Sequence, residues 1–267
     1  MIDVRPLTGI SFETLAAAFN DAFSDYAVPM KMTAETLEML QRRRGYVPEA
    51  SLGAFDGERI VGFVLTCVDG DRAYNSGTGV ATSHRRRGIA RELMDRVSDL
   101  VAKRGAKSYL LEVIESNERA AALYRAVGFE ERRRFQCWTV EPRRPNRRFV
   151  EMANADLDAI ASRADVELAW QNSVAAIERA IEPYVVLGDD DGAVVFFPKS
   201  GDLPLLTVRK DVRRTGMATQ LLAAATTRAA KTLSVRNVDD RDRGIAAFMD
   251  AAGAKAVVRQ IEMLRTF

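Results

Sequence analysis

An internal repeat limits the fold of this chain more than any other feature of its sequence. The runs VATSHRRRGIA (residues 80–90) and VRKDVRRTGMA (residues 208–218) share a valine, an arginine five positions later, and a closing glycine and alanine at identical spacing. Further along each half, AALYRAVG ending at Gly128 matches AAFMDAAG ending at Gly253 without a gap. Two matches in the same order predict a tandem duplication, so we expect two domains within the 267 residues.

The first half alternates between predicted strands and helices. Two Asp-Gly turns, at residues 56–57 and 69–70, separate β-rich runs and predict an antiparallel meander over residues 51–80. Around it, we expect a strand at 2–7, helices at 12–23 and near 37–40, a helix after Gly88, a strand at 108–114, a helix from Asn117 to Gly128, and a strand at 132–140.

The second half starts again after EPRRPNRR, residues 141–148, which has the composition of a linker. We expect a strand at 148–152, a helix over 156–181, a hairpin around Asp191-Gly192, a strand at 203–208, a helix carrying Met217 and Leu221, a strand at 234–238, a helix at 244–253, and a strand at 257–267. The prediction is an α/β (α+β) fold with domains at residues 1–142 and 148–267. Each domain has a mixed, mainly antiparallel twisted sheet flanked by helices.

Composition argues against several classes of protein. A net charge of +2 argues against a protein that coats nucleic acid, and we expect the arginines at 132–134 and 143–148 to form solvated faces and a linker. The single histidine, His84, cannot build a zinc cluster, and Cys67 and Cys137 lack metal-ligand spacing. No leader is apparent, and no apolar run approaches the roughly 18 residues that span a bilayer. We expect a cytoplasmic protein without metal, membrane or nucleic-acid partner; the oligomeric state stays open.

The run SHRRRGIA, residues 83–90, joins a predicted strand to a predicted helix. The first turn of a helix leaves backbone N–H groups unpaired and carries partial positive charge, and a phosphate can satisfy both. Gly88 would let the backbone approach such an anion, and the arginines would add donors. A Walker loop does not fit, because no Gly-Lys-Ser/Thr follows. Taken alone, the run fits a solvated helix start as well as a phosphate cradle.

The surrounding motifs favour the cradle, because the first half resembles the GNAT superfamily of acyl-CoA-dependent N-acyltransferases. Arg85, Gly88 and Ala90 fit that family's Arg/Gln-x-x-Gly-x-Gly/Ala pattern. Asn117 and Tyr124, followed by Gly-Phe, fit its later helix. The resemblance covers residues 1–140 well and 148–267 more weakly. It implies acetyl-CoA or another acyl-CoA as co-substrate, with its pyrophosphate on the backbone N–H groups of residues 86–90. The implied cofactor-binding residues are Val80, Arg85, Arg86, Arg87, Gly88, Ile89, Ala90 and Asn117.

The chemistry implied by the resemblance is direct attack of an amine on the thioester. The carbonyl oxygen needs a hydrogen-bond donor, expected to be a backbone N–H near Val80. Gly77 and Gly79 suit a bulge or separation of the strands there, and relaxation of a twisted strand explains these glycines equally well. The departing thiolate needs a proton, and the resemblance assigns the general acid to Tyr124. A core tyrosine on an amphipathic helix is the alternative.

The remaining roles are less sharply defined. Glu112, a carboxylate within an apolar strand, is the candidate general base, and a water chain is equally compatible. Asp25 and Tyr26 are the candidate acceptor-binding residues, although a structural turn explains Asp25 as well. We expect His84 to be a solvated loop residue.

The second half departs from the pattern at the positions that carry chemistry. Anchored on Gly253, the tyrosine position holds Met249 and the asparagine position holds Asp242. Arg213 and Gly216 remain, so anion binding is conceivable while catalysis is not expected there. The leading hypothesis is an N-acetyltransferase with one active half that acts on a small-molecule amine. The alternatives are a protein-lysine acetyltransferase and a non-catalytic CoA-binding sensor or scaffold.

Overall fold

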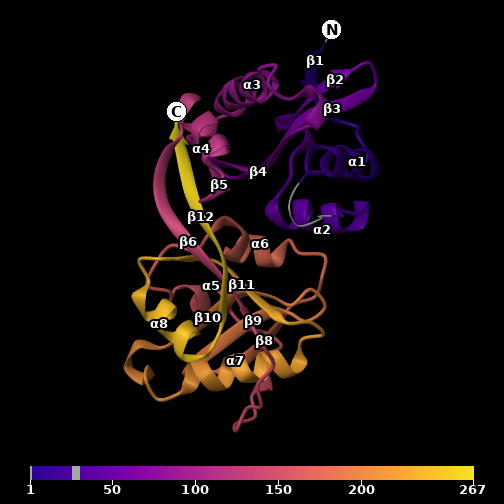
Figure 1. Ribbon diagram of the computed structural model, residues 1–267. Helices are drawn as coiled ribbons and strands as arrows, with labels where there is room; N and C mark the ends of the chain where they lie inside the picture. Colours follow the sequence, from indigo (N-terminus) through magenta and orange to yellow (C-terminus); the bar gives the residue numbers. More distant parts are fainter. Residues whose placement is uncertain (1, 26–30) are drawn as a thin grey trace. The chain divides into compact units, whose positions relative to one another are not determined.

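The computed structural model describes residues 2–25 and 31–267 (Figure 1). The chain forms two compact units: unit 1 consists of Met1–Arg132 with Ile261–Phe267, and unit 2 of Arg133–Gln260. These bounds follow the packing of the chain, whereas the predicted limits of 1–142 and 148–267 follow the repeat in the sequence. Each unit therefore contains one copy of the repeat, and the last residues of the chain belong to unit 1.

Unit 1 has the elements that its sequence predicts. Ser11 and Thr33 each cap a helix by accepting a hydrogen bond from a backbone N–H three residues later. The elements are β1 (Asp3–Pro6), α1 (Phe12–Ala22), α2 (Ala34–Arg44), β2 (Leu52–Asp56), β3 (Arg59–Asp69), β4 (Arg72–Val80), α3 (Ile89–Lys103), β5 (Ser108–Ile114), α4 (Glu118–Ala126) and the start of β6 (Glu130–Val140).

The sheet of unit 1 has the strand order β1-β2-β3-β4-β5, followed by the end of β12 (Lys255–Thr266). The strands from β1 to β4 pair antiparallel as the predicted meander, and β4 pairs with β5 in parallel. Two apolar cores lie on its faces. One contains residues of α3 and α4, including Leu93 and Tyr124, and the other contains residues of α1 and α2, including Leu15 and Leu37. The sheet is thus covered by helices on both faces, as Figure 1 shows for this unit.

Unit 2 repeats this plan with different helices. Its strand order is β6-β11-β10-β9-β8-β7, antiparallel except for β10 with β11. One core contains α7 and α8 residues and the other contains α5 and α6 residues. The elements are β7 (Val150–Glu151), α5 (Leu157–Ala161), α6 (Val174–Glu178), β8 (Val185–Asp189), β9 (Gly192–Phe197), β10 (Asp202–Val208), α7 (Met217–Arg228), β11 (Leu233–Asp239) and α8 (Arg243–Ala251).

The predicted continuous helix over residues 156–181 is wrong. The structure has the two short helices α5 and α6, separated by a non-helical stretch and a short 3-10 turn at Trp170–Asn172. Ser173 has an extended backbone with ψ 153° and caps α6 through the N–H of Ala176, so one helix cannot run through it. Within the described ranges, no helix combines the length and apolar character needed to cross a membrane.

Candidate functional site

In unit 1, β4 and β5 pair over four residues and then separate. The pairs run from Arg72–Ser108 to Asn75–Leu111, after which both strands continue without pairing to each other. Immediately beyond the last pair, Ser76 is an extra residue in β4, because Leu65 faces Gly77 while Thr66 faces Asn75. The separation therefore begins at a bulge beside Gly77.

Glu112 is the first residue of β5 beyond the paired stretch. The Tyr74 hydroxyl on β4 donates a hydrogen bond of 2.7 Å to Glu112 Oε2. Burial, followed by the adjacent Glu112 carboxylate, raises the pKa of Tyr74 well above its ordinary value, so the phenol stays protonated and remains a donor. Glu112 is thus a carboxylate held in place by a neutral phenol where the strands part.

The end of α2 contacts the bulge in β4. The Ser76 hydroxyl donates to Gln41 Oε1 at 2.6 Å, and Arg44 Nη1 donates to the Ser76 carbonyl at 3.3 Å. Gln41 is only 2% exposed, so this is a buried polar contact on the α1/α2 side of the strand. The contacts of Tyr74, Gln41, Arg44 and Ser76 were not predicted from the sequence. For Tyr74, the available signal was its place on a predicted strand next to the one that carries Glu112.

Tyr124 lies on α4, whose start is fixed as predicted. The Asn117 side chain caps the helix by accepting from the Ala120 N–H at 3.2 Å. Tyr124 is 8% exposed, and its ring centroid lies 6.1 Å from that of Phe129. Tyr124 is therefore a core residue, and its role as an acid stays a prediction.

The run 80–90 forms a tight loop between β4 and α3. Arg86 has φ 63° and Gly88 has φ 80°, and Gly88 is the residue preceding α3. A Cβ at Gly88 would meet no atom of the protein within 4 Å, and the positive φ itself favours glycine at this position. Ile89 is buried, while Arg86, Arg87 and Gly88 are exposed, which leaves the start of α3 accessible. Such a helix start can bind an anion.

Arg85 points back to the protein. Its Nε donates to the Val80 carbonyl at 3.2 Å, and its guanidinium binds both Asp25 oxygens at 2.6 and 2.9 Å and the Ala22 carbonyl at 2.7 Å. This Arg85 contact holds the pKa of Asp25 below its ordinary value. The predicted cofactor residue and the predicted acceptor residue are thus an ion pair that joins the loop to the end of α1. Tyr26 lies outside the described residues.

His84 differs from its prediction as a solvated residue. It is 8% exposed, and its ring nitrogens lie 2.9 Å from Ser83 Oγ and 3.3 Å from Asp56 Oδ2. Arg133 is also buried rather than solvated, at 5% exposure, and its Nη1 lies 3.2 Å from Asp239 Oδ2 within unit 2.

Unit 2 contains the same arginine arrangement. Arg213 Nε donates to the Val208 carbonyl at 3.1 Å, and its guanidinium binds the Asp165 carboxylate and the Arg163 carbonyl. The contact with Arg213 lowers the pKa of Asp165. The loop dihedrals match as well, with φ 67° at Arg214 and φ 91° at Gly216. The duplication is therefore visible in side-chain contacts and backbone angles.

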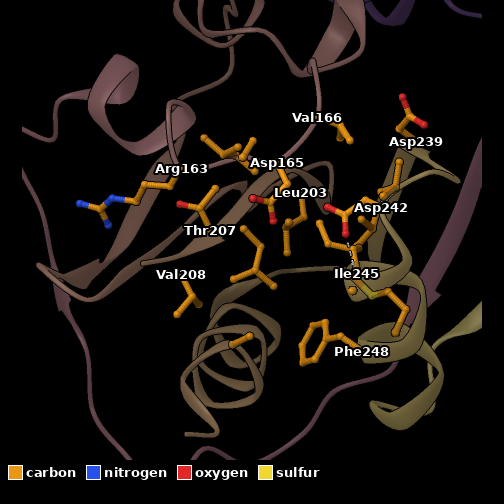
Figure 2. A pocket seen from close by; sticks show the side chains of 18 of the residues that line it. Arg163, Asp165, Val166, Leu203, Thr207, Val208, Asp239, Asp242, Ile245 and Phe248 are labelled. Carbon is orange, nitrogen blue, oxygen red and sulfur yellow. Dashed lines mark hydrogen bonds between the residues drawn. The ribbon is translucent and has the colours of Figure 1, made fainter. Parts of the chain in front are cut away.

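A pocket of about 490 Å³ lies in unit 2 next to this loop. Figure 2 shows Asp165, Thr207, Asp242 and Phe248 around it. Its walls come from the 163–172 segment, β10, the start of α7, β11 and α8. β10 and β11 pair only at Asp202–Ser234, so they part earlier than β4 and β5 do. Pro204, which has no N–H to donate, follows that pair in β10.

Three positions that are predicted to take part in the chemistry of unit 1 hold other residues in unit 2. Continuing the gapless match that relates Gly128 to Gly253 places Asn237 opposite Glu112, in addition to Met249 opposite Tyr124 and Asp242 opposite Asn117. β5 and β11 each have seven residues and share this register. Sequence analysis missed the change at Asn237, although extending the same match to the strand would have found it.

Comparison with known proteins gives consistent results. Residues 13–129 match the model described as the Acetyltransferase (GNAT) family. Among curated proteins, the chain is 36% identical over 73 residues to the [ribosomal protein bS18]-alanine N-acetyltransferase of Escherichia coli, an alignment that covers 27% of this chain and 49% of the relative. The chain thus spans about half the length of the curated relatives it matches.

Solved structures match the whole chain. A putative acetyltransferase from Pyrococcus horikoshii has a TM-score of 0.76 at 17% identity, covering 100% of this chain and 89% of that one. A tandem GNAT protein from the clavulanic acid biosynthesis pathway has a TM-score of 0.69 at 15% identity, covering 100% and 98%. At these identities the likeness establishes the fold, which is that of a tandem GNAT protein over both units.

Proposed function

We propose that unit 1, in which residues 13–129 match the GNAT acetyltransferase family model, transfers an acyl group, in the simplest case acetyl, from CoA to a primary amine. The observation that carries this proposal is the contrast between the units. Unit 1 has a carboxylate, Glu112, and a phenol, Tyr124, in register with the loop 80–90, whereas unit 2 has Asn237 and Met249 at these places.

The loop 80–90 binds the pyrophosphate of CoA through the backbone N–H groups of residues 86–90. The exposed start of α3 and the open space beside Gly88 support this assignment. Arg85 supports the loop through its ion pair with Asp25, and Arg86 and Arg87 supply charge at the rim. Asn117 caps α4, and a contact with CoA is an additional role for it.

In the reaction, the amine attacks the thioester carbon, and its nitrogen loses a proton as the CoA thiolate leaves. Glu112 accepts the proton from the amine, directly or through water, and Tyr124 donates a proton to the thiolate. The Tyr74 hydroxyl orients the Glu112 carboxylate. The backbone of β4 between the bulge and Val80 is the expected source of the donor to the carbonyl oxygen.

The acceptor is a small-molecule amine in the leading form of the proposal. A protein N-terminus is the second candidate, because the E. coli relative is named for N-acetylation of a ribosomal protein alanine. A lysine side chain is a further protein amine of the same class. A non-catalytic CoA sensor is disfavoured by the retention of both Glu112 and Tyr124.

The direct test is release of CoA thiol from acetyl-CoA in the presence of an amine panel. The panel should contain small diamines and amino acids, a peptide with an N-terminal alanine, and a lysine peptide with a blocked N-terminus. Release that depends on one class of amine identifies the acceptor. If the protein binds acetyl-CoA but no amine stimulates release between pH 6 and 9, unit 1 is a sensor and the proposal is wrong.

A further inference from the structure

The extra residue in the bulge of β4 takes its partners from α2. Ser76 has no opposite residue on β3. Its hydroxyl donates to Gln41 Oε1 at 2.6 Å, and its carbonyl accepts from Arg44 Nη1 at 3.3 Å. The hydroxyl oxygen also lies 3.2 Å from the Leu65 carbonyl. Two side chains of one helix therefore bind both the side chain and the backbone of the bulged residue.

The end of α2 is itself fixed to β3. Gly45 ends the helix with φ 83°, and its carbonyl accepts from the Val68 N–H at 3.0 Å. Two residues further on, the Val47 N–H donates to the Thr66 carbonyl at 2.9 Å. These hydrogen bonds do not involve Ser76, so the end of α2 is a fixed support to which the bulge is attached.

The bulge decides which backbone N–H groups face the gap between β4 and β5. The Ala81 N–H donates to the Val61 carbonyl at 2.9 Å, so this position is hydrogen-bonded to β3. Because directions alternate along an antiparallel strand, the N–H groups of Val80 and Thr78 point away from β3, to the side where β5 has separated. An extra residue shifts this alternation by one position. Without the bulge, the same two N–H groups would point to β3.

Arg44 connects the bulge with the second polar feature of the gap. Burial and then the Glu112 carboxylate raise the pKa of Tyr74, and the Arg44 guanidinium partly offsets this rise. The Arg44 charge is therefore close to the phenol that donates to Glu112. One side chain of α2 thus reaches both the bulge and the proposed base with its partner.

Unit 2 has a bulge at the same place and forms it differently. β10 gains one residue relative to β9 between Asp202 and Leu205. The repeat match that aligns the two arginine loops places Pro204 at the position of Ser76. Proline has no N–H for the ladder and suits a bulge by itself, but it has no hydroxyl to donate to a helix. The polar contact with a helix side chain is therefore specific to the unit that has the carboxylate and the phenol.

We propose that Gln41 and Arg44 are positioning residues for the reaction of unit 1. By holding Ser76 in the bulge, they keep the N–H groups of Thr78 and Val80 directed into the gap, where the thioester carbonyl oxygen needs a donor. Neither side chain has to touch the substrate for this role. The inference rests on the proposed transfer reaction and adds residues outside its reacting groups.

Steady-state kinetics test the role of the two side chains. Gln41→Met and Arg44→Met replace each with an unbranched apolar side chain and remove its contact with Ser76. We expect each change to lower kcat roughly 10- to 100-fold at an unchanged KM for acetyl-CoA, because a misdirected donor weakens the transition state alone. Arg44→Lys keeps a charged donor and should retain most of the parent kcat.

Arg42→Met is the matched control on the same helix. The Arg42 side chain is 59% exposed and binds Glu38 at 2.8 Å, so this variant should have the parent kcat. Parent-like kcat in both Gln41→Met and Arg44→Met would overturn the proposal, and so would a raised KM for acetyl-CoA at unchanged kcat. An Arg44→Lys variant as slow as Arg44→Met would contradict the donor role of Arg44.

Hydrogen exchange followed by mass spectrometry tests the bulge without the reaction. The N–H groups of Gly79 and Ala81 pair with β3 and should be protected in the parent. We expect peptides covering residues 72–81 to exchange faster in the Gln41→Met/Arg44→Met double variant, with β1 and β2 unchanged. Equal exchange in both proteins overturns the proposal. Faster exchange in a chain that transfers no acyl group would support the contact between α2 and the bulge and refute the proposed function alone.

Discussion

The two units of this chain share a scaffold and differ where a reaction would occur. In both, an arginine five residues beyond the strand binds the strand-ending valine carbonyl and an aspartate, and the next arginine and the glycine of the loop have positive φ. Glu112 and Tyr124 of unit 1 correspond in sequence to Asn237 and Met249 of unit 2. The comparison teaches that the loop before the helix is retained in both copies, although the residues proposed to move protons in unit 1 are not.

The units also differ in how far the central strands separate. Four residue pairs join β4 to β5, and a single pair joins β10 to β11. Earlier separation leaves more room between the strands, and the described pocket of unit 2 lies along them. The substitutions at Asn237 and Met249 are therefore accompanied by a shorter pairing of the two central strands.

The largest effect should come from removing the proposed acid. Tyr124→Phe keeps the ring and its packing against Phe129, and we expect turnover to fall about 100- to 10,000-fold with the affinity for acyl-CoA retained. Steady-state CoA release and equilibrium binding measure the two quantities. Tyr184→Phe in unit 2, which removes a hydroxyl from a 37% exposed tyrosine, is the control and should be fully active. Parent-like turnover of Tyr124→Phe between pH 6 and 9 would assign the protonation to water.

Shortening a buried side chain in one unit tests whether the two units unfold independently. Met249 is 1% exposed, and Met249→Ala should lower the free energy of unfolding of unit 2 by about 2–5 kcal/mol. Both tryptophans, Trp138 and Trp170, belong to unit 2, so their fluorescence in a urea titration reports this unit. Met263→Ala, at an equally buried site of unit 1, should leave that transition in place. If the two variants shift it equally, the units unfold as one.

Alkaline pH should destabilise unit 1 before unit 2. Burial raises the pKa of Tyr46 to about 12 and raises that of Tyr74 and Tyr109, all in unit 1, while unit 2 has only Tyr184. A raised folded-state pKa gives stability that is complete below the unfolded value of about 10 and is lost above it. Tyr46 alone should cost roughly 1 kcal/mol by pH 11. Tyrosine near-UV circular dichroism and tryptophan fluorescence in urea at pH 8 and 11 compare the units; earlier loss of the tryptophan signal would contradict this order.

The smallest effects should come from the paired aspartates. Asp25→Asn and Asp165→Asn weaken equivalent ion pairs whose carboxylates are 54% and 35% exposed, and exposed pairs contribute little to stability. Both pKa values are lowered, so this contribution is present above the unfolded value of about 4 and is lost as the pH falls through the folded value. We expect small and similar decreases in Tm at pH 7 that vanish at pH 2 to 3. A large decrease for only one variant would show that the two loops are not equivalent.

Patterns within single elements were enough to predict most of the fold. The Asp-Gly turns predicted the meander, and the spacing after Gly88 and Asn117 predicted α3 and α4, because these signals are local. The helix over 156–181 was wrong, because hydrophobic spacing does not reveal that Ser173 starts a new helix. The hydrogen bond from Tyr74 to Glu112 depends on the pairing register of β4 and β5. This register could not be predicted, because the two strands are far apart in the sequence.

The sequence by itself determined the duplication, the two arginine- and glycine-containing loops that precede α3 and α7, and the absence of the tyrosine from the second copy, because each depends on residue types at fixed spacing. Only the tertiary structure decided which charged side chains pair with each other. It pairs Arg85 with Asp25 and Arg213 with Asp165 across 60 and 48 residues, and it brings Gln41 of α2 to Ser76 of β4. Hydrogen bonds form between atoms that are close in space, and distances between segments far apart in the chain arise only when the sheet and its helices have packed.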